Sequence, residues 1–172
     1  HPSAGGPSPE IRIETVPAQP KHYYRHAVWM KGGNGRPWVA ASGVEGIESV
    51  KVHGLKPGAY RVSLTFANPS AQERSFDIRI QDRVRSQGLR LDKAMFAKTK
   101  VYYDIRSEGS IQINLEAQTG TTQLSGIEIV AMELANEWSL EWCPGCCRQC
   151  SSAAAVLLTP PALHRHWRSA LS

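Results

Sequence analysis

The chain has 172 residues, of which 41% are hydrophobic and 20% charged, a composition that is ordinary for a globular protein with one sizeable core. Its net charge is +5, and its longest apolar run, AAAVLL at 153–158, is far shorter than the roughly 20 residues of a membrane-spanning helix. The segment 79–106 holds eight basic and three acidic residues, an excess equal to that of the whole chain. Such a basic face can attract anionic polymers, but a solvated strand surface is the simpler interpretation.

The chain opens with HPSAGGPSPE, rich in Pro, Gly and Ser, and we interpret residues 1–9 as a linker. Beyond it, apolar and polar residues alternate with period two, as in YRVSLTF, which is typical of half-buried strands. Strands are predicted at 11–16, 26–30, 48–53, 60–66, 75–81, 88–92, 100–105, 110–116 and 125–132. For the segment 90–98, which overlaps one of these strands, a helical turn is the alternative prediction. These short strands, spaced by roughly 8–12 residues, predict an all-β fold, an antiparallel jelly-roll-like β-sandwich over 10–132.

After Met132 the alternation stops, and we expect an irregular, poorly structured tail over 133–172. All four cysteines lie in this tail, in CPGCCRQC at 143–150, as two CxxC pairs without a spacer. Zinc sites commonly separate their two ligand pairs by about 12 or more residues, and haem attachment requires a histidine directly after the pair. We therefore predict no metal, and the cluster is either incidental or forms structural disulfides.

No catalytic or nucleotide-binding motif is recognisable in the chain. GGNGRPW at 32–38 is glycine-rich, but it lacks the third glycine and the strand–helix context of a dinucleotide-binding loop. Aromatic residues within the basic segment form at most part of a base-stacking platform, so nucleic acid is not an expected partner. The chain is predicted to be no enzyme and to need no cofactor.

Three segments carry a family resemblance, namely YRVSLTFANP, RSFDIRIQDRVR and LSGIEIV. They are similar to the malectin-like family, in which a strand Y-x-V-x-L-x-F-A-E, a loop, R-x-F-D-V-x-I-x-G and a closing G-I-E-I strand follow one another. Asn68 replaces the usual acid and Asp82 the usual glycine. The resemblance covers about residues 37–131 and is to bacterial versions, often modules of large secreted proteins. It implies a galactose-binding, malectin-like sandwich that binds carbohydrate.

The resemblance implies a sugar site of loop aromatics and an acid at one end of the sandwich, where an aromatic ring covers the C–H face of a pyranose. Two of these groups are missing. The loop after the strand at 60–66, ANPSAQER, should hold an aromatic pair but has none, and the loop before the closing strand, QTGTTQ, should hold an acid but has none. We therefore predict a replacement site upstream, formed by Tyr23, Tyr24, Asn34 and Trp38. Tyr24 and Trp38 are expected to be exposed, and Trp29 is expected in the core, because HAVWM reads as a strand.

The sequence thus predicts a non-catalytic carbohydrate-binding module of a larger secreted protein, located outside the cell or in the periplasm. Its expected partners are the parent multidomain protein and a polysaccharide or glycan, neutral or anionic, with no membrane contact. The alternative is a structural or protein-interaction β-sandwich module that has lost the sugar site. The exposure of two aromatic residues distinguishes these hypotheses, since a binding module exposes Tyr24 or Trp38 in a groove, whereas a structural module buries both.

Overall fold

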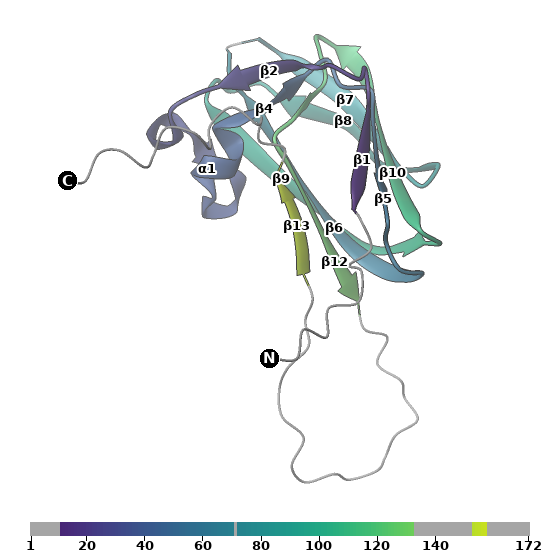
Figure 1. Ribbon diagram of the computed structural model, residues 1–172. Coiled ribbons are helices and arrows are strands. Elements are labelled where there is room, and N and C mark those ends of the chain that lie inside the picture. Colours follow the sequence, from purple (N-terminus) through teal and green to yellow (C-terminus); the bar gives the residue numbers. More distant parts are fainter. Residues whose placement is uncertain (1–10, 71, 133–152, 158–172) are drawn as a thin grey trace, which may run out of the picture.

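The computed structural model describes residues 11–70, 72–132 and 153–157, which form an all-β sandwich with two five-stranded sheets (Figure 1). The first sheet has the order β1-β5-β10-β7-β8, with the bounds Arg12–Val16, Ser49–His53, Ser110–Thr119, Arg74–Ile80 and Arg83–Leu91. The second sheet has the order β13-β12-β6-β9-β3, with the bounds Ala153–Leu157, Gly126–Met132, Gly58–Asn68, Phe96–Ser107 and Lys31–Gly32. Neighbouring strands are antiparallel except β3 and β9, which are parallel.

A small third sheet lies at one end of the sandwich (Figure 1). Its order is β11-β4-β2, with the bounds Gln123–Leu124, Ser42–Glu45 and Lys21–Tyr24. Between β2 and β4 the chain forms the short turns η1 (Ala27–Trp29) and η2 (Gly33–Gly35) and the one-turn helix α1 (Pro37–Ala40). A small cluster of buried apolar residues joins these segments to the second sheet, and it comprises Tyr23, Met30, Ala40, Ala67 and Ala97.

The main core lies between the two large sheets, where period-two alternation brings their apolar faces together. On β6, Val62, Leu64 and Phe66 are fully buried, and on β7 so is Phe76. The rings of Phe66 and Phe76 meet edge to face across the sandwich, 5.3 Å between centroids. The predicted strands therefore form, with the exception of 26–30. The segment 90–98 contains the end of β8 and the start of β9 and not the alternative helical turn.

The segment 26–30 is not a strand but contains the 3₁₀ turn η1, so that prediction was wrong. Trp29 is 59% exposed, and its ring lies 5.7 Å from the ring of His26. The expectation that Trp29 belongs to the core was therefore also wrong. HAVWM has four consecutive apolar residues with no polar residue between them, so it lacks the alternation that marks a half-buried strand. In this segment only Met30 is buried.

The sequence GGNG at 32–35 forms a left-handed turn, with φ angles of 77°, 65°, 56° and 74°. Side chains disfavour this conformation, and asparagine is among the residues that tolerate it best. A Cβ on Gly32 would lie 2.3 Å from the carbonyl oxygen of Ala97 in β9. Glycine therefore lets the turn lie directly against the second sheet, and this contact fixes where Asn34 projects.

Gly32→Ala is expected to lower the free energy of unfolding by about 2 kcal/mol or more, because a left-handed alanine is strained by ~1–2 kcal/mol and its Cβ also meets Ala97. Gly35→Ala is the matched control, since Gly35 is equally left-handed but has no atom within 4 Å of its would-be Cβ. Its expected cost is about 1 kcal/mol. Urea unfolding measures both, and equal losses would show that the contact with β9 contributes nothing.

β13 extends the second sheet beyond β12, with Gly126 opposite Leu157 and Val130 opposite Ala153. This strand falls within 133–172, where the sequence predicted no regular structure, and it is formed by the apolar run AAAVL.

The cysteine motif at 143–150 lies outside the described residues. Within the described part of the chain, no group of three or more His, Cys, Asp or Glu residues could hold a metal ion. No helix of that part is long and apolar enough to cross a membrane.

Candidate functional site

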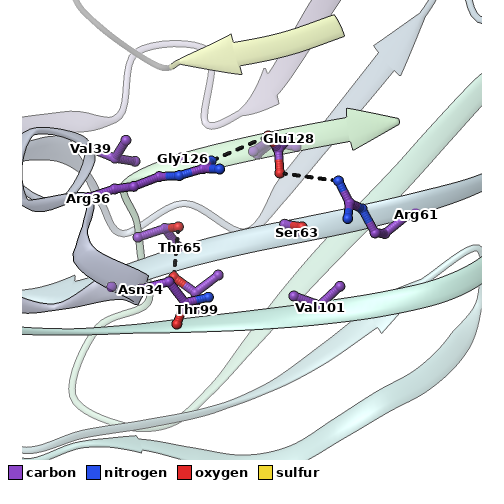
Figure 2. A pocket seen from close by; sticks show the side chains of 12 residues that line it. Asn34, Arg36, Val39, Arg61, Ser63, Thr65, Thr99, Val101, Gly126 and Glu128 are labelled. Atoms are coloured by element: carbon purple, nitrogen blue, oxygen red, sulfur yellow. Dashed lines mark hydrogen bonds and ion pairs between the residues drawn. The ribbon is translucent and has the colours of Figure 1, made fainter. Parts of the chain in front are cut away.

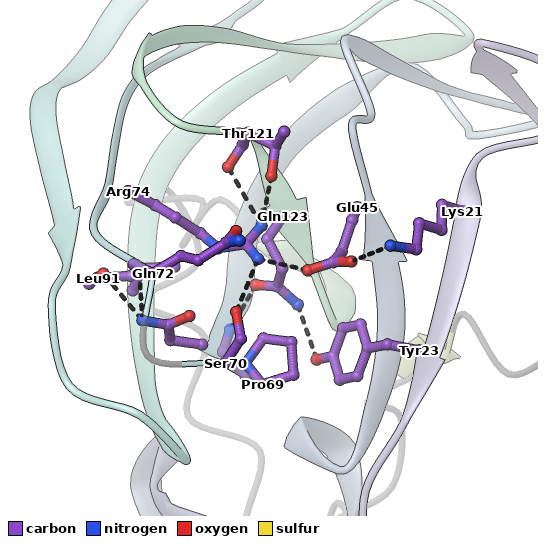
Figure 3. Close-up of polar contacts among 12 residues, drawn as sticks. Lys21, Tyr23, Glu45, Pro69, Ser70, Gln72, Arg74, Leu91, Thr121 and Gln123 are labelled. Carbon is purple, nitrogen blue, oxygen red and sulfur yellow. Dashed lines mark hydrogen bonds and ion pairs between the residues drawn. The ribbon is translucent and has the colours of Figure 1, made fainter.

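A groove of about 630 Å³ opens at the end of the sandwich that carries the small sheet. Its walls are β2 with Arg25, the end of β4, Pro69, Ser70 and Gln72 in the loop between β6 and β7, and Thr121 in the loop before β11. We call this cavity the end groove. These two loops are the ones in which the family resemblance places the sugar-binding groups. Figure 3 shows the polar contacts that hold the walls together.

Arg74, the first residue of β7, links the walls of the end groove, and its side chain is only 2% exposed. Its guanidinium donates to Glu45 Oε1 at 2.5 Å, to Thr121 Oγ1 at 2.6 Å and to Ser70 Oγ at 3.3 Å (Figure 3). Lys21 Nζ lies 3.6 Å from the second carboxylate oxygen of Glu45. Charge-assisted hydrogen bonds of this kind are strong and directional. They join β4 and both loops, so the groove is largely preformed.

Asn68, the last residue of β6, is fully buried beneath the 69–73 loop. Its Nδ2 donates to the carbonyl oxygens of Gln72 at 2.8 Å and Leu91 at 3.1 Å. Both hydrogens of the amide therefore meet acceptors, which a carboxylate could not satisfy. The departure from the family's acid at this position thus has a structural role here, holding the loop against the end of β8.

Tyr23 is only 6% exposed and belongs to the small core, although part of it borders the end groove. Its hydroxyl donates to Ala40 O at 3.1 Å, accepts from Gln123 Nε2 at 2.8 Å and lies 2.7 Å from Ser125 Oγ. Burial raises the pKa of Tyr23 to about 12, although the hydrogen bond with Ser125 opposes the shift. Successive residues of a strand face opposite sides, so the burial of Tyr23 directs Tyr24 outward.

The exposed wall of the end groove carries both aromatic and charged side chains. Tyr24 is 44% exposed and lines the groove together with His22. Arg25 Nε donates to the carbonyl oxygen of Pro69 at 3.1 Å, which ties β2 to the facing loop. The lining residues include three cations, Lys21, Arg25 and Arg74, and one acid, Glu45. The groove therefore combines an aromatic face, hydroxyl and amide groups, and an excess of positive charge.

The other predicted site residues lie elsewhere. Asn34 lines a different cavity, on the outer face of the second sheet. Trp38 is 61% exposed on α1 and lines neither this cavity nor the end groove. Val28 and Trp29 are also exposed on η1, which contacts α1, and we call these three exposed apolar side chains the helical patch. The four predicted residues therefore do not form one platform, and the sequence analysis missed Arg74 as the residue that organises the groove.

No family model and no curated protein sequence matches the chain. Solved structures do match. Bacteroides uniformis beta-glucuronidase aligns with a TM-score of 0.57 and 20% identity, over 66% of this chain and 14% of that chain. The ANXUR1 extracellular domain from Arabidopsis thaliana aligns with a TM-score of 0.51 and 12% identity, over 64% of this chain and 38% of that chain.

These likenesses show a shared β-sandwich fold, which agrees with the fold implied by the malectin-like resemblance. A family 35 carbohydrate binding module from Clostridium thermocellum aligns over 99% of its own length, but its TM-score of 0.40 supports no inference. The chain spans less than two thirds of both the glucuronidase and the ANXUR1 domain.

Proposed function

We propose that the protein is a non-catalytic carbohydrate-binding module that binds a polysaccharide in the end groove, with Tyr24 as its aromatic platform. The observation that carries this proposal is that Tyr24 is exposed on a groove whose facing walls are the two loops singled out by the family resemblance. An exposed ring beside hydroxyl and amide groups can cover the C–H face of a sugar while its hydroxyls are bound. Exposure of Tyr24 in a groove is the outcome expected of a binding module rather than of a scaffold.

An anionic polysaccharide is the favoured ligand. The carboxylate of Glu45 is already in contact with the buried Arg74, whereas the cationic groups of Lys21 and Arg25 are exposed at the rim. A carboxylate or sulfate on the ligand would complement this charge, and binding should weaken as salt increases. We further propose that the module belongs to a secreted multidomain protein, outside the cell or in the periplasm, since it matches a small part of a larger enzyme chain.

A protein-interaction role is the second candidate, and the helical patch is the observation that favours it. Val28, Trp29 and Trp38 are all more than half exposed on adjacent short segments. Contiguous apolar surface of this kind often marks a contact with another protein. In this role the parent protein would cover the patch, and Trp38→Ala would weaken that contact without affecting a glycan in the end groove.

Tyr24→Ala tests the carbohydrate-binding proposal. The full chain is screened on a glycan array with sulfated and uronic-acid polysaccharides, and the best ligand is titrated by calorimetry. The substitution is expected to weaken binding about ten-fold, or ~1.4 kcal/mol, because the stacking ring is lost. Tyr103→Ala is the matched control, since Tyr103 is also exposed but lies on β9 and does not line the groove.

Unchanged binding by the Tyr103 and Trp38 variants, together with the loss for Tyr24→Ala, would support the end groove. An array without any bound glycan, or a Tyr24 variant that binds like the parent, would contradict the proposal. Either of these results would favour the interaction role of the helical patch.

A further inference from the structure

A second cavity, of about 220 Å³, lies on the outer face of the second sheet and shares no lining residue with the end groove (Figure 2). Three strands form its floor, with Gly126, Thr65 and Thr99 opposite one another in one row and Glu128, Ser63 and Val101 in the next. Its wall is formed by η2 with Asn34, by Arg36 between the two segments, and by α1 with Val39. We call this cavity the face pocket.

The face pocket is hollow because the outward-facing residues beneath it are small. The alternation that buries Leu64 in the core turns Ser63 and Thr65 outward, where their short side chains leave space above the sheet. α1 approaches closely at one side, since a Cβ on Gly126 would lie 2.6 Å from Val39 Cγ1. The left-handed turn at 32–35 holds the rest of the wall. The backbone of the fold therefore forms the floor and one side of the pocket, and the side chains of Arg36, Arg61 and Glu128 complete its lining.

Two arginines approach one carboxylate in this pocket from opposite sides (Figure 2). Arg36 Nη1 lies 3.3 Å from Glu128 Oε1, and Arg61 Nη2 lies 3.9 Å from Glu128 Oε2. The second distance is too long for a hydrogen bond. In addition, Arg61 Nε is buried with no acceptor among the described residues. The lining residues thus carry two positive charges against one negative, and the guanidinium of Arg61 is poorly paired.

These features define what the pocket can accept. An arginine pairs most strongly with a planar carboxylate, through two parallel hydrogen bonds. The floor offers hydroxyl groups from Ser63, Thr65 and Thr99, of which the two threonine hydroxyls are 3.2 Å apart and bonded to each other. A neutral hexose would match the hydroxyls but not the charge. Inorganic sulfate would match the charge but not the hydroxyls.

We propose that the face pocket is a separate binding site for a hexuronic acid residue, a sugar ring that bears a carboxylate. The ligand carboxylate would lie against the guanidinium of Arg61, whose contact with Glu128 is long at 3.9 Å, and would compete with Glu128 for Arg36. The ring hydroxyls would meet the threonine hydroxyls of the floor and the amide of Asn34. This site stands independently of the end groove, because none of its residues takes part in the proposed role of Tyr24.

The test is an NMR titration of the full chain with methyl glucuronide, and with methyl glucoside as the matched neutral sugar. Methyl glucuronide is expected to shift the amide signals of Thr65, Thr99 and Gly126, and methyl glucoside to bind at least ten-fold more weakly. Arg61→Gln and Arg36→Gln are each expected to weaken glucuronide binding about ten-fold. Arg83→Gln is the control, since it removes the same charge from the other sheet, away from the pocket.

Three outcomes would overturn the proposal. If Arg83→Gln and Arg61→Gln lower the affinity for methyl glucuronide equally, only the net charge of the protein matters. If sodium sulfate binds as tightly as methyl glucuronide, the sugar ring has no role. Shifts confined to His22, Tyr24 and other end-groove residues would also overturn it, while leaving the function proposed for the end groove intact. Conversely, if Tyr24→Ala abolishes binding on the glycan array, that result concerns the end groove and leaves the proposal for the face pocket unchanged.

Discussion

Replacing Arg74 by methionine is expected to lower the free energy of unfolding by about 3 kcal/mol or more. The substitution keeps an apolar side chain of similar length but removes the guanidinium. Glu45, whose side chain is 14% exposed, then loses its buried partner, and Ser70 and Thr121 lose the donor that joins their loops. Removing one member of a buried ion pair is strongly destabilising, and the exposed Lys21, 3.6 Å from the other oxygen of Glu45, compensates the remaining charge only in part. Urea unfolding followed by tryptophan fluorescence measures the loss.

Arg79→Met provides the matched control on the same strand. Arg79 Nε lies 3.0 Å from Glu116 Oε1, but both side chains are well exposed, so the pair should contribute less than ~1 kcal/mol. Adding Glu45→Gln to Arg74→Met is expected to recover part of the stability, because the lone carboxylate is then removed. Similar losses for Arg74→Met and Arg79→Met would contradict the role assigned to the buried pair.

Asn68→Asp is expected to cost about 3 kcal/mol or more at pH 7, although it changes one atom. The new side chain would be fully buried and would face the carbonyl oxygens of Gln72 and Leu91. An ionised carboxylate would repel both, and even a protonated one could donate to only one of them. The measurement is the difference in unfolding free energy between the variant and the parent, as a function of pH.

The pH dependence follows from the direction in which burial shifts the pKa of the introduced carboxyl. Burial disfavours the charged form and raises this pKa above its unfolded value of ~3.9. The folded variant then holds a proton that the unfolded chain releases, so stability is lost as the pH rises above ~4 and is partly regained in acid. Asn114→Asp is the control, because Asn114 Oδ1 already accepts a hydrogen bond from Gln112 Nε2, and a carboxylate can do the same. A pH-independent cost at Asn68 would contradict this account.

The fold could be predicted from the sequence where alternation was strict. The sequences of β6 and β7 alternate between apolar and polar residues, because each strand has one face against the core; in β7 the burial alternates as strictly, whereas in β6 Ser63 on the outer face is buried as well. β2 was missed since only Tyr23 in KHYY is buried, which is too little signal in four residues. β13 was missed because its run of alanines shows no alternation. η1 was mistaken for a strand because its composition is apolar, whereas its position between two short strands requires a turn.

The candidate site could be predicted only in part. Tyr24 was correctly expected to be exposed, but nothing in the sequence indicates that Glu45 and Arg74, which are 29 positions apart, come into contact. One signal was present, since Arg74 falls on the inward face that Phe76 and Ile78 define, and a charge on that face needs a buried partner. The face pocket could not be predicted, because it depends on the register that places Glu128 opposite Ser63.

β13 also bears on how the protein behaves at high concentration. It pairs with one side of β12, so the backbone groups along that side bond within the molecule. An open strand edge can instead recruit the edge of another chain and lead to aggregation. A shortened protein that ends at residue 132 would keep every residue of the end groove and the face pocket and still expose this edge. Colloidal stability would then depend on β13, whose pairing with β12 covers this edge.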